Sequence, residues 1–495
     1  METKTKLVRL TAKKSESYMR LLPWIIACMM IIGINYAYYD CIDAVRNSVN
    51  VWYALFDGKF LNFYSYTRYA EHEITFPVFQ GVHNGASYSY LAYLVFGLWT
   101  FPLYILERFL GVNLFWHSWG VVYAKTGLLL VSYISSNLLG RITYRITGDA
   151  EKSEMAALLY LTSPFFFSST VAVGQLEAIT IYLMLMGFWY YLDDSPLFLL
   201  FFSLAIPFKY FALIAFIPLL LIKEKNILRI GLKSVAVVTP TVLSFLLFLK
   251  DQYRYVGVME DSDRPIGDNT FSLLSDGMMS SGSTWSVGGL KINLFFVALI
   301  ILWVWCYVQN TKSEAELAQK AAFGAFATLL SFLLLFSPVY PYWCILMVPF
   351  GILAIIFNAR NIKEAVITGT IASASYVLWQ LVSYYWVFGL YAMQSNVFLS
   401  EKQPFATTEI SVLNYWDLAG RIIGIPLVSL YSLGFASLVV TAFIYLVKLV
   451  YPSSSKNRSN VFSKEIAIRL GVSFSVMMIA AICVYGLMLY KGLIL

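Results

Sequence analysis

The strongest pattern along the chain is a series of long, almost continuous apolar runs separated by short polar stretches. Several runs reach the roughly 20 residues that a helix needs to cross a hydrocarbon core, among them 21–39, 235–249 with its flanks, and 471–490. The runs do not alternate with period two, and in a membrane only helices and closed barrels satisfy every backbone polar group. The pattern therefore predicts an all-α polytopic membrane protein with about 11–14 transmembrane helices.

The other apolar runs follow the first at intervals that fit successive spans. They cover 87–106, 119–139, 154–173, 177–192, 196–222, 234–249, 291–309, 321–337, 342–357, 365–386, 420–447 and 469–490. We expect a basic cytoplasmic segment at 1–20, a catalytic transmembrane module at 21–222 and a C-terminal transmembrane module at 223–495. The predicted external loops, of which the first is the large one in the N-terminal half, are 40–86, 250–290 and 387–419.

Composition favours a chain surrounded by lipid. Of the 495 residues, 59% are hydrophobic and 13% charged, with a mean hydropathy of +0.69, whereas soluble domains carry about a quarter charged residues. The net charge of +7 fits orientation signals on short loops. It does not indicate nucleic-acid binding, because no basic stripe with interleaved aromatic residues lies in a soluble segment. The five cysteines form neither a disulfide framework nor a metal-binding cluster.

Basic residues indicate how the runs are oriented. Six Lys and Arg residues precede residue 21 and place the N-terminus in the cytoplasm. In the N-terminal half, plain counting puts the basic stretch 141–152 outside and the turn at 174–177 inside. Both reverse if 87–106 dips into the membrane and returns, and if 196–222 is two half-length helices hinged at Lys209. We favour this second arrangement because it obeys the charge rule.

Two aspartates open the first predicted external loop. Asp40 lies at the outer end of the first run, and Asp43 follows one helical turn later. A carboxylate at the mouth of an interfacial cavity is well placed to accept the proton of an attacking sugar hydroxyl. The alternative is that a helix ending at the interface simply meets water and polar residues there.

The same loop is rich in aromatic rings, amides and acids. Sugar sites use rings against pyranose faces and polar groups on hydroxyls, so that His83 is a candidate substrate-binding residue. An interfacial aromatic belt has a similar composition. The Glu-His-Glu segment at 71–73, together with His83, is an alternative site for a divalent cation, but its spacing matches no known metal motif. No metal or other cofactor is therefore assigned.

Charged side chains inside apolar runs are costly and are functional candidates. Lys209 lies within 197–222, too far from either end to reach the interface easily. It needs an anionic partner, either a nearby carboxylate or a lipid phosphate. Lys125 lies similarly within 119–139, and a buried structural ion pair is the alternative for both lysines.

Two polar turns join apolar runs. The first is Gly174-Gln175-Leu176-Glu177, and the second, at 336–343, contains two prolines and several aromatic residues. Proline breaks and aromatic clusters at span ends are common structural features, so each turn alone is a weak signal.

Together these features resemble the polytopic glycosyltransferases of the GT-C superfamily. The resemblance rests on an acid opening the first loop, a Gly-Gln-x-Asp/Glu turn, a lysine in the next pair of spans and a Pro-Tyr/Trp turn. It is closest to bacterial branches near the mannosyltransferases and the dolichyl-phosphate-mannose-dependent enzymes. It covers the N-terminal half well and the rest only by the number of helices.

The resemblance implies roles for particular residues. Asp40 would be the catalytic base, with Asp43 as the alternative because the first loop lacks the paired Asp-Glu of the family. Glu177 would occupy the second acidic position, where the family more often has Asp, and Lys209 would contact the donor phosphate. Tyr340 and Trp343 would line the lipid or sugar path. The substrate-binding set is then Lys209, Gln175, Glu177, His83, Tyr340 and Trp343.

Enzymes of this kind use a polyprenyl-phosphate sugar as donor and invert the anomeric centre. The resemblance thus implies a membrane hexosyltransferase that modifies a cell-envelope glycan, lipid or protein at the outer face of a bacterial plasma membrane. The alternative is a polytopic transporter or lipid flippase, which also uses charges at the midplane and broken helices. Transporters often have two related halves, and the C-terminal half here has no counterpart to Asp40 or Lys209. This asymmetry favours the enzyme.

Overall fold

The structure is a computed structural model of the whole chain. It describes residues 23–31, 33–34, 36–37, 39–68, 86, 88–112, 119–251, 284–287, 290–335, 341–358, 362–382, 394–395, 424, 436, 440, 444 and 465–475.

The N-terminal part is built from short helices that follow the first apolar run. Helical residues 23–31 and 33–34 lead into the two-residue strand β1 (Tyr36–Ala37). The next elements are α2 (Tyr39–Phe56), the 3₁₀ turn η1 (Phe60–Asn62), α3 (Phe63–Arg68) and α4 (Tyr90–Leu110).

The predicted external loop 40–86 is therefore largely helical where the structure describes it. Its polar residues suggested an open loop, but on α2 they lie in the protein interior and bond to one another, as Asp43 does with Arg46 and Asn47. Apolar contacts hold α2 against α4. Among them, the rings of Trp52 and Phe101 meet edge to face, with 4.7 Å between their centroids. Paired polar groups do not need water, so a polar stretch can form a buried helix.

The central elements follow without a gap in the described chain. They are α5 (Trp119–Thr147), α6 (Ala150–Leu161), α7 (Pro164–Phe166), the π-helix η3 (Phe167–Val173), α8 (Glu177–Leu192), α9 (Leu197–Ala205), α10 (Phe211–Lys223) and α11 (Ile227–Leu247).

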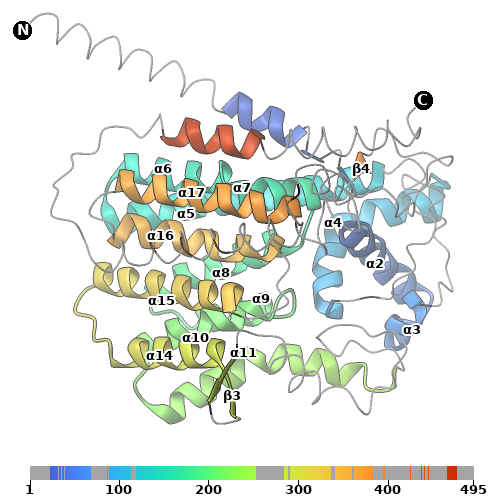
Figure 1. Cartoon of the computed structure of the whole chain (residues 1–495). Helices are drawn as coiled ribbons and strands as arrows, with labels where there is room; N and C mark the ends of the chain where they lie inside the picture. The colour runs from blue at the N-terminus through green and yellow to red at the C-terminus, as the bar shows by residue number, and fades with distance from the viewer. Residues whose placement is uncertain are drawn as a thin grey trace, which may run out of the picture.

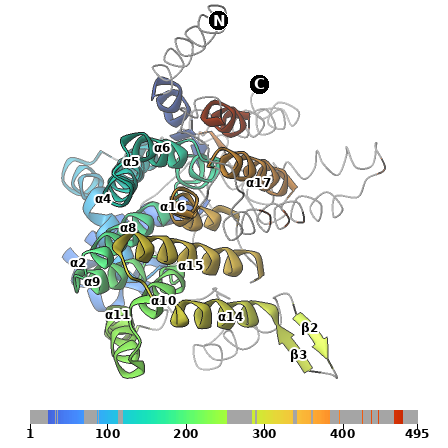
Figure 2. The same ribbon diagram turned by 90° about the vertical axis from the view of Figure 1, so that its left-hand side faces the viewer.

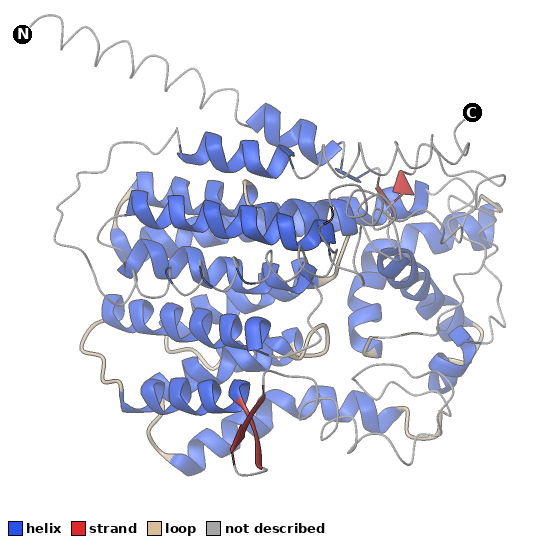
Figure 3. Ribbon diagram, viewed as in Figure 1, coloured by secondary structure: helices blue, strands red, loops and turns tan. Residues whose placement is uncertain are grey.

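The C-terminal part adds further helices and three short strands. These elements are β2 (Thr284–Val287), β3 (Leu290–Asn293), α14 (Leu294–Val308), α15 (Glu314–Leu335), the 3₁₀ segment η5 (Pro341–Met347), α16 (Val348–Asn358), α17 (Ile362–Val382) and β4 (Gln394–Ser395). Strands β2 and β3 pair antiparallel, and β1 pairs antiparallel with β4 so that Tyr36 lies opposite Ser395. The fold is nevertheless all-α, as the distribution of helix in Figure 3 shows.

The long helices form a bundle with the early helices at one end. Helices α5, α6, α16 and α17 run side by side, with α15 and α14 next to them, while α2, α3 and α4 group beyond one end of the bundle (Figure 1). Seen from the side, α11 lies at the margin and the β2–β3 pair projects past α14 (Figure 2). The exposure of α11 agrees, because among its described side chains only Val237 is buried.

Ion pairs identify which helix ends lie together. Arg145, near the end of α5, contacts both Asp193 and Glu314 at 2.6 Å, which joins the ends of α5 and α8 to the start of α15. Lys223 at the end of α10 contacts Asp194 at 2.7 Å, and its hydrogen bond lowers the pKa of that carboxyl. The starts of α8 and α10, with the turn at 174–177, therefore lie at the opposite end.

This grouping of helix ends agrees with the arrangement favoured from the charges. The path of the chain between these ends, however, differs in part from the predicted one. The predicted hinge is confirmed, because α9 and α10 are separate helices with a break at 206–210 that contains Lys209. The predicted dip and return of 87–106 is wrong, since α4 is one continuous helix of 21 residues. A return would have required a break in its hydrogen-bond ladder.

Two of the described helices, Tyr90–Leu110 and Ile227–Leu247, are long and apolar enough to cross a membrane. The pair Ala150–Leu161 and Pro164–Val173 also meets this test when taken together, and it is bent by 42°, as in a broken span or a re-entrant segment. Shorter apolar helices are Glu177–Leu192, Phe211–Lys223, Phe295–Val308 and Tyr342–Asn358. The larger number of spans stays a prediction, because runs such as 420–447 lie mostly outside the described residues.

Candidate functional site

The Gly-Gln-x-Glu turn is a buried bend between a π-helix and an α-helix. Gly174 directly follows the π-helix η3, has a left-handed φ of 78°, and donates its amide hydrogen to Ser169 O at 3.0 Å. A Cβ at Gly174 would lie 2.7 Å from Cys41 Sγ and 2.9 Å from Lys125 Cε. Only glycine combines this backbone conformation with so close an approach. The turn thus places Gln175 and Glu177 at the start of α8, and both are buried.

Lys209 reaches this turn from the break between α9 and α10. Its ammonium lies 3.0 Å from Glu177 Oε1, and the two side chains are 12% and 0% exposed. The backbone amide of Lys209 still donates to Ala205 O at 3.2 Å, so the break is a tight turn. Burying two charges is tolerated when they pair closely. Of the two anionic partners expected from the sequence, a carboxylate or a phosphate, Lys209 contacts a carboxylate in the structure.

Two aromatic residues complete the surroundings of the ammonium. Lys209 Nζ donates to Tyr88 Oη at 3.2 Å, and Tyr88 Oη in turn donates to Gln175 Oε1 at 3.2 Å. The ammonium also lies 4.8 Å from the Tyr88 ring centroid and 5.4 Å from that of Trp343. A cation close to aromatic rings is attracted by their quadrupoles.

The cluster brings together four predicted site residues from distant parts of the chain: Gln175, Glu177, Lys209 and Trp343. Tyr88 was missed, and its only sequence signal was its place in a tyrosine-rich stretch at the start of the apolar run 87–106. Chemically the cluster offers a fixed cation, a carboxylate, an amide and two rings. Such groups suit an anionic group joined to a sugar, with the cation near the anion and the rings near the sugar.

The sequence comparison adds the family. The family model for glycosyltransferase family 87 matches residues 94–338, about half of the chain. The chain belongs to this family. Family 87 is of the GT-C type, so the GT-C resemblance is confirmed and the protein is a membrane glycosyltransferase. No curated protein matches the chain.

The family 87 match includes the residues at the centre of the cluster, namely Gln175, Glu177 and Lys209. Tyr88 and Trp343 lie just outside its two ends, and both candidate bases precede it. The match thus supports the glycosyltransferase activity, and the roles of individual side chains rest on geometry.

The candidate bases both lie on α2, within its first turns. Asp43 is buried and accepts hydrogen bonds from Arg46 and Asn47, each at 3.2 Å. Its Oδ1 is therefore already occupied by a guanidinium and an amide. Asp40 is one turn earlier, and its side chain lies outside the described residues, as do His83 and Tyr340.

The metal alternative is not tested by the structure. Its residues at 71–73 and His83 lie outside the described part of the chain. Within the described part, no group of three or more His, Cys, Asp or Glu residues could hold a metal ion.

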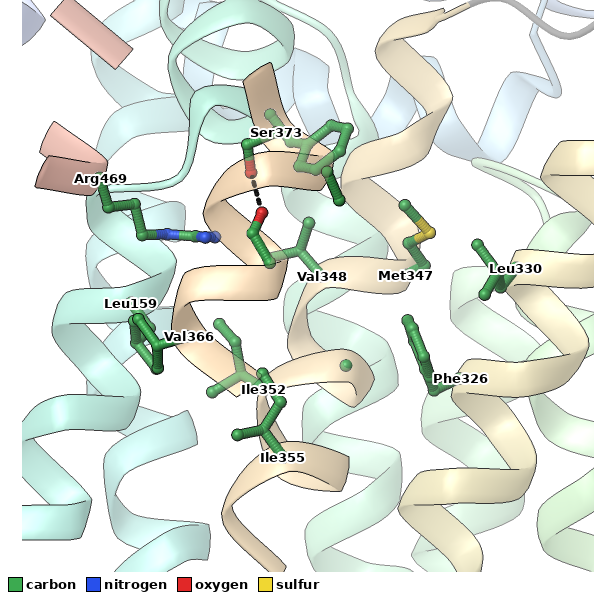
Figure 4. A pocket seen from close by; sticks show the side chains of 14 residues that line it. Leu159, Phe326, Leu330, Met347, Val348, Ile352, Ile355, Val366, Ser373 and Arg469 are labelled. Carbon is green, nitrogen blue, oxygen red and sulfur yellow. Dashed lines mark hydrogen bonds between the residues drawn. The ribbon is translucent and has the colours of Figure 1, made fainter. Parts of the chain in front are cut away.

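A cavity of about 80 Å³ lies elsewhere in this glycosyltransferase, between α6, α15, α16 and α17. Figure 4 shows its apolar lining, including Leu159, Phe326 and Ile352, with Arg469 reaching in from 465–475. None of the predicted site residues lines it. None of its lining residues in the described part of the chain is an acid, and none belongs to the Glu177–Lys209 cluster.

Proposed function

We propose that this family 87 enzyme transfers a hexose from a polyprenyl-phosphate donor to a glycan, lipid or protein acceptor of the cell envelope, at the outer face and with inversion. The observation that carries the proposal is the Lys209 ammonium, buried beside Glu177 and close to the rings of Tyr88 and Trp343. A leaving group that is a lipid phosphate develops negative charge, and a pre-placed cation stabilises it.

In the proposed reaction, the acceptor hydroxyl oxygen forms a bond to the anomeric carbon as its proton passes to the Asp40 carboxylate. The bond between the anomeric carbon and the phosphate oxygen breaks on the opposite face, which inverts the centre. Polyprenyl phosphate leaves with the bonding electron pair, beside Lys209. Asp43 is not the proposed base, because it is paired with Arg46 at 3.2 Å.

An apolar groove supports the proposed lipid donor. A space of about 750 Å³ is lined by Leu55, Phe60, Tyr90, Leu94, Pro240 and Leu243, among others. Its lining residue Tyr90 is two positions after Tyr88 in the chain, and its lining residue Ser244 contacts Ser89 through their hydroxyls at 3.3 Å. An isoprenoid chain in this groove would bury apolar surface while its phosphate lies toward Lys209.

The outer-face assignment is supported by the distribution of charge. Arg145, Lys223 and Lys233 lie toward one end of the bundle, and the Glu177–Lys209 pair lies at the other. Basic residues mark the cytoplasmic side, which leaves the site outside. We infer a multi-pass protein of a bacterial plasma membrane with a cytoplasmic N-terminus.

The test is sugar transfer by the purified enzyme in nanodiscs. Radiolabelled polyprenyl-phosphate hexose and a membrane acceptor extract are supplied, and a nucleotide-activated hexose is used in a parallel reaction. Transfer from the lipid donor alone is the expected result. Transfer from the nucleotide sugar alone would overturn the proposed donor class.

A further inference from the structure

Lys125 is a second buried lysine, and the Glu177–Lys209 cluster does not include it. It lies on α5 and is 1% exposed. Its ammonium donates to Ala172 O at 2.7 Å and to Gly33 O at 3.4 Å. These acceptors are far apart in the chain, so one side chain joins three segments of the fold.

Both acceptors lie at the C-terminal ends of helical segments. Ala172 is in the last turn of η3, and Gly33 is in the helical residues directly before β1. The last carbonyls of a helix lack partners within it and carry a partial negative charge. An ammonium placed between two such ends satisfies carbonyls from both, and in a water-poor interior this interaction is strong.

Each helical segment leads into a part of the proposed active site. Directly after Ala172 comes the turn that carries Glu177, and shortly after Gly33 come β1 and the start of α2 with Asp40. Cys41 Sγ and Lys125 Cε both lie within 3 Å of where a Cβ at Gly174 would be. The start of α2, the turn and Lys125 are therefore packed together without spare room.

We propose that Lys125 is a positioning residue that fixes the start of α2 relative to the Glu177–Lys209 pair. The proposal rests on the proposed function, in which Asp40 and Lys209 act on opposite sides of the same sugar. Transfer needs near-attack geometry, and a displacement of about 1 Å can cost ~10²-fold in rate. Lys125 touches neither substrate in this arrangement and acts through the two segments that it joins.

The first test separates kcat from KM. Lys125→Met keeps the length of the side chain and removes the donors, so kcat should fall by about 10²-fold while KM for the lipid donor changes by less than about twofold. Lys125→Gln keeps an NH₂ donor without the charge and should restore part of kcat. A purely structural role would change the amount of folded enzyme and leave kcat per folded molecule intact.

Lys223 provides a matched control. Its ammonium donates to Tyr191 O at 2.7 Å, in the last turn of α8 but at the opposite end of the bundle. Lys223→Met therefore removes the same kind of contact away from the proposed site, together with the ion pair to Asp194. Its kcat should remain within about twofold of the wild-type value. An equal loss of kcat in both variants would overturn the specific role of Lys125.

A second measurement does not depend on activity. Cys41 is buried beside Gly174 and Lys125, and Cys306 and Cys344 are buried elsewhere. With Cys28 and Cys483 replaced by serine, Lys125→Met should raise the maleimide labelling rate of Cys41 about tenfold through local opening. Labelling of Cys306 and Cys344 should not change, which shows that the fold is retained.

The outcomes are distinguishable. Wild-type kcat together with wild-type protection of Cys41 in Lys125→Met overturns the proposal. If all three cysteines become reactive in both Lys125 variants, the residue supports the whole fold and the positioning role is also overturned. If the wild-type enzyme uses no polyprenyl-phosphate sugar, the proposed function fails, and Cys41 labelling still decides whether Lys125 joins the two segments.

Discussion

Glu177 and Lys209 are both removed from water, so the effect of changing either residue depends on the other. A carboxylate at the end of an apolar run looks easy to replace when only the sequence is known. The structure shows it fully buried against an ammonium at 3.0 Å. Removing one member of such a pair leaves an uncompensated charge in the interior, which costs far more than the pair contributes.

We therefore expect Lys209→Met to lose both stability and donor binding. The buried and unpaired Glu177 carboxylate should lower the free energy of unfolding by about 3–5 kcal/mol. In the double variant Lys209→Met/Glu177→Gln, no charge is left buried, and thermal stability in nanodiscs should largely recover. Donor binding, measured with labelled polyprenyl-phosphate hexose, should stay weak in both variants. Recovery of binding in the double variant would show that Lys209 serves only to neutralise Glu177.

The two aspartates of α2 form an internal comparison. Asp40→Asn keeps size and polarity but removes a proton acceptor, so transfer should slow by roughly 10²–10⁴-fold while donor binding survives. Asp43→Asn should mainly weaken the contact with Arg46 and lower stability, with a smaller effect on the rate. The measurement is single-turnover transfer with donor binding determined separately. A dead Asp43→Asn beside an active Asp40→Asn would assign the base to Asp43.

At the residue scale, the sequence selected several polar residues that lie together in the structure, but it did not predict the contacts between them. Gln175, Glu177 and Lys209 were found because charged and amide groups are rare within apolar runs. Tyr88 was not found, because tyrosines near span ends are common in any membrane protein. Its contact with Lys209 joins residues 121 positions apart, a pairing that only the folded chain shows.

Among the elements, the π-helix before the turn is the feature that sequence patterns did not predict. The run 154–173 reads as one span, whereas the structure bends it by 42° and winds its second half as η3. Pro164 marks the bend, but a π-helix has no comparable signature in the sequence. Residues 40–56 were predicted to lie in an external loop but form most of α2. Their polar side chains, such as Asp43, Arg46 and Asn47, bond to one another in the interior.

The turn after η3 gives a prediction about Gly174. Alanine there must adopt a φ of 78° and also overlap Cys41 Sγ, so Gly174→Ala should displace the turn. Gly148 also has a positive φ, of 64°, but nothing lies within 4 Å of its Cβ position. Gly148→Ala should therefore lower the free energy of unfolding only by the conformational cost of a left-handed alanine, about 1–2 kcal/mol. Transfer should fall sharply in Gly174→Ala and stay near wild type in Gly148→Ala.

An equal, small effect of both glycine substitutions would contradict the close packing at the turn. Thermal unfolding of the two variants supplies the comparison, because the conformational term is common to both. The difference between them measures the overlap with Cys41 and Lys125.

At the scale of the whole molecule, the two ends of the bundle carry different chemistry. Arg145 and Lys223 pair with acids at one end, whereas the other end carries the Glu177–Lys209 pair and the α2–α4 group. The charge rule predicted this segregation correctly, since it depends only on composition near span ends. The charge rule did not predict the path of the chain between the two ends, because the position of α4 depends on its packing against α2.

The opposite placement of these ends makes a final prediction about sidedness. Lys59, just after α2, and Asp194, between α8 and α9, are both exposed, and they lie toward opposite ends of the bundle. With Cys28 and Cys483 replaced by serine, Lys59→Cys should react with a membrane-impermeant maleimide in intact cells. Asp194→Cys should react only after permeabilisation, because its basic neighbours Arg145 and Lys223 mark the cytoplasmic side. Labelling of both from the same side would contradict the opposite placement. If the sides are reversed, the cluster faces the cytoplasm, where nucleotide sugars are available, and a polyprenyl-phosphate donor is no longer required.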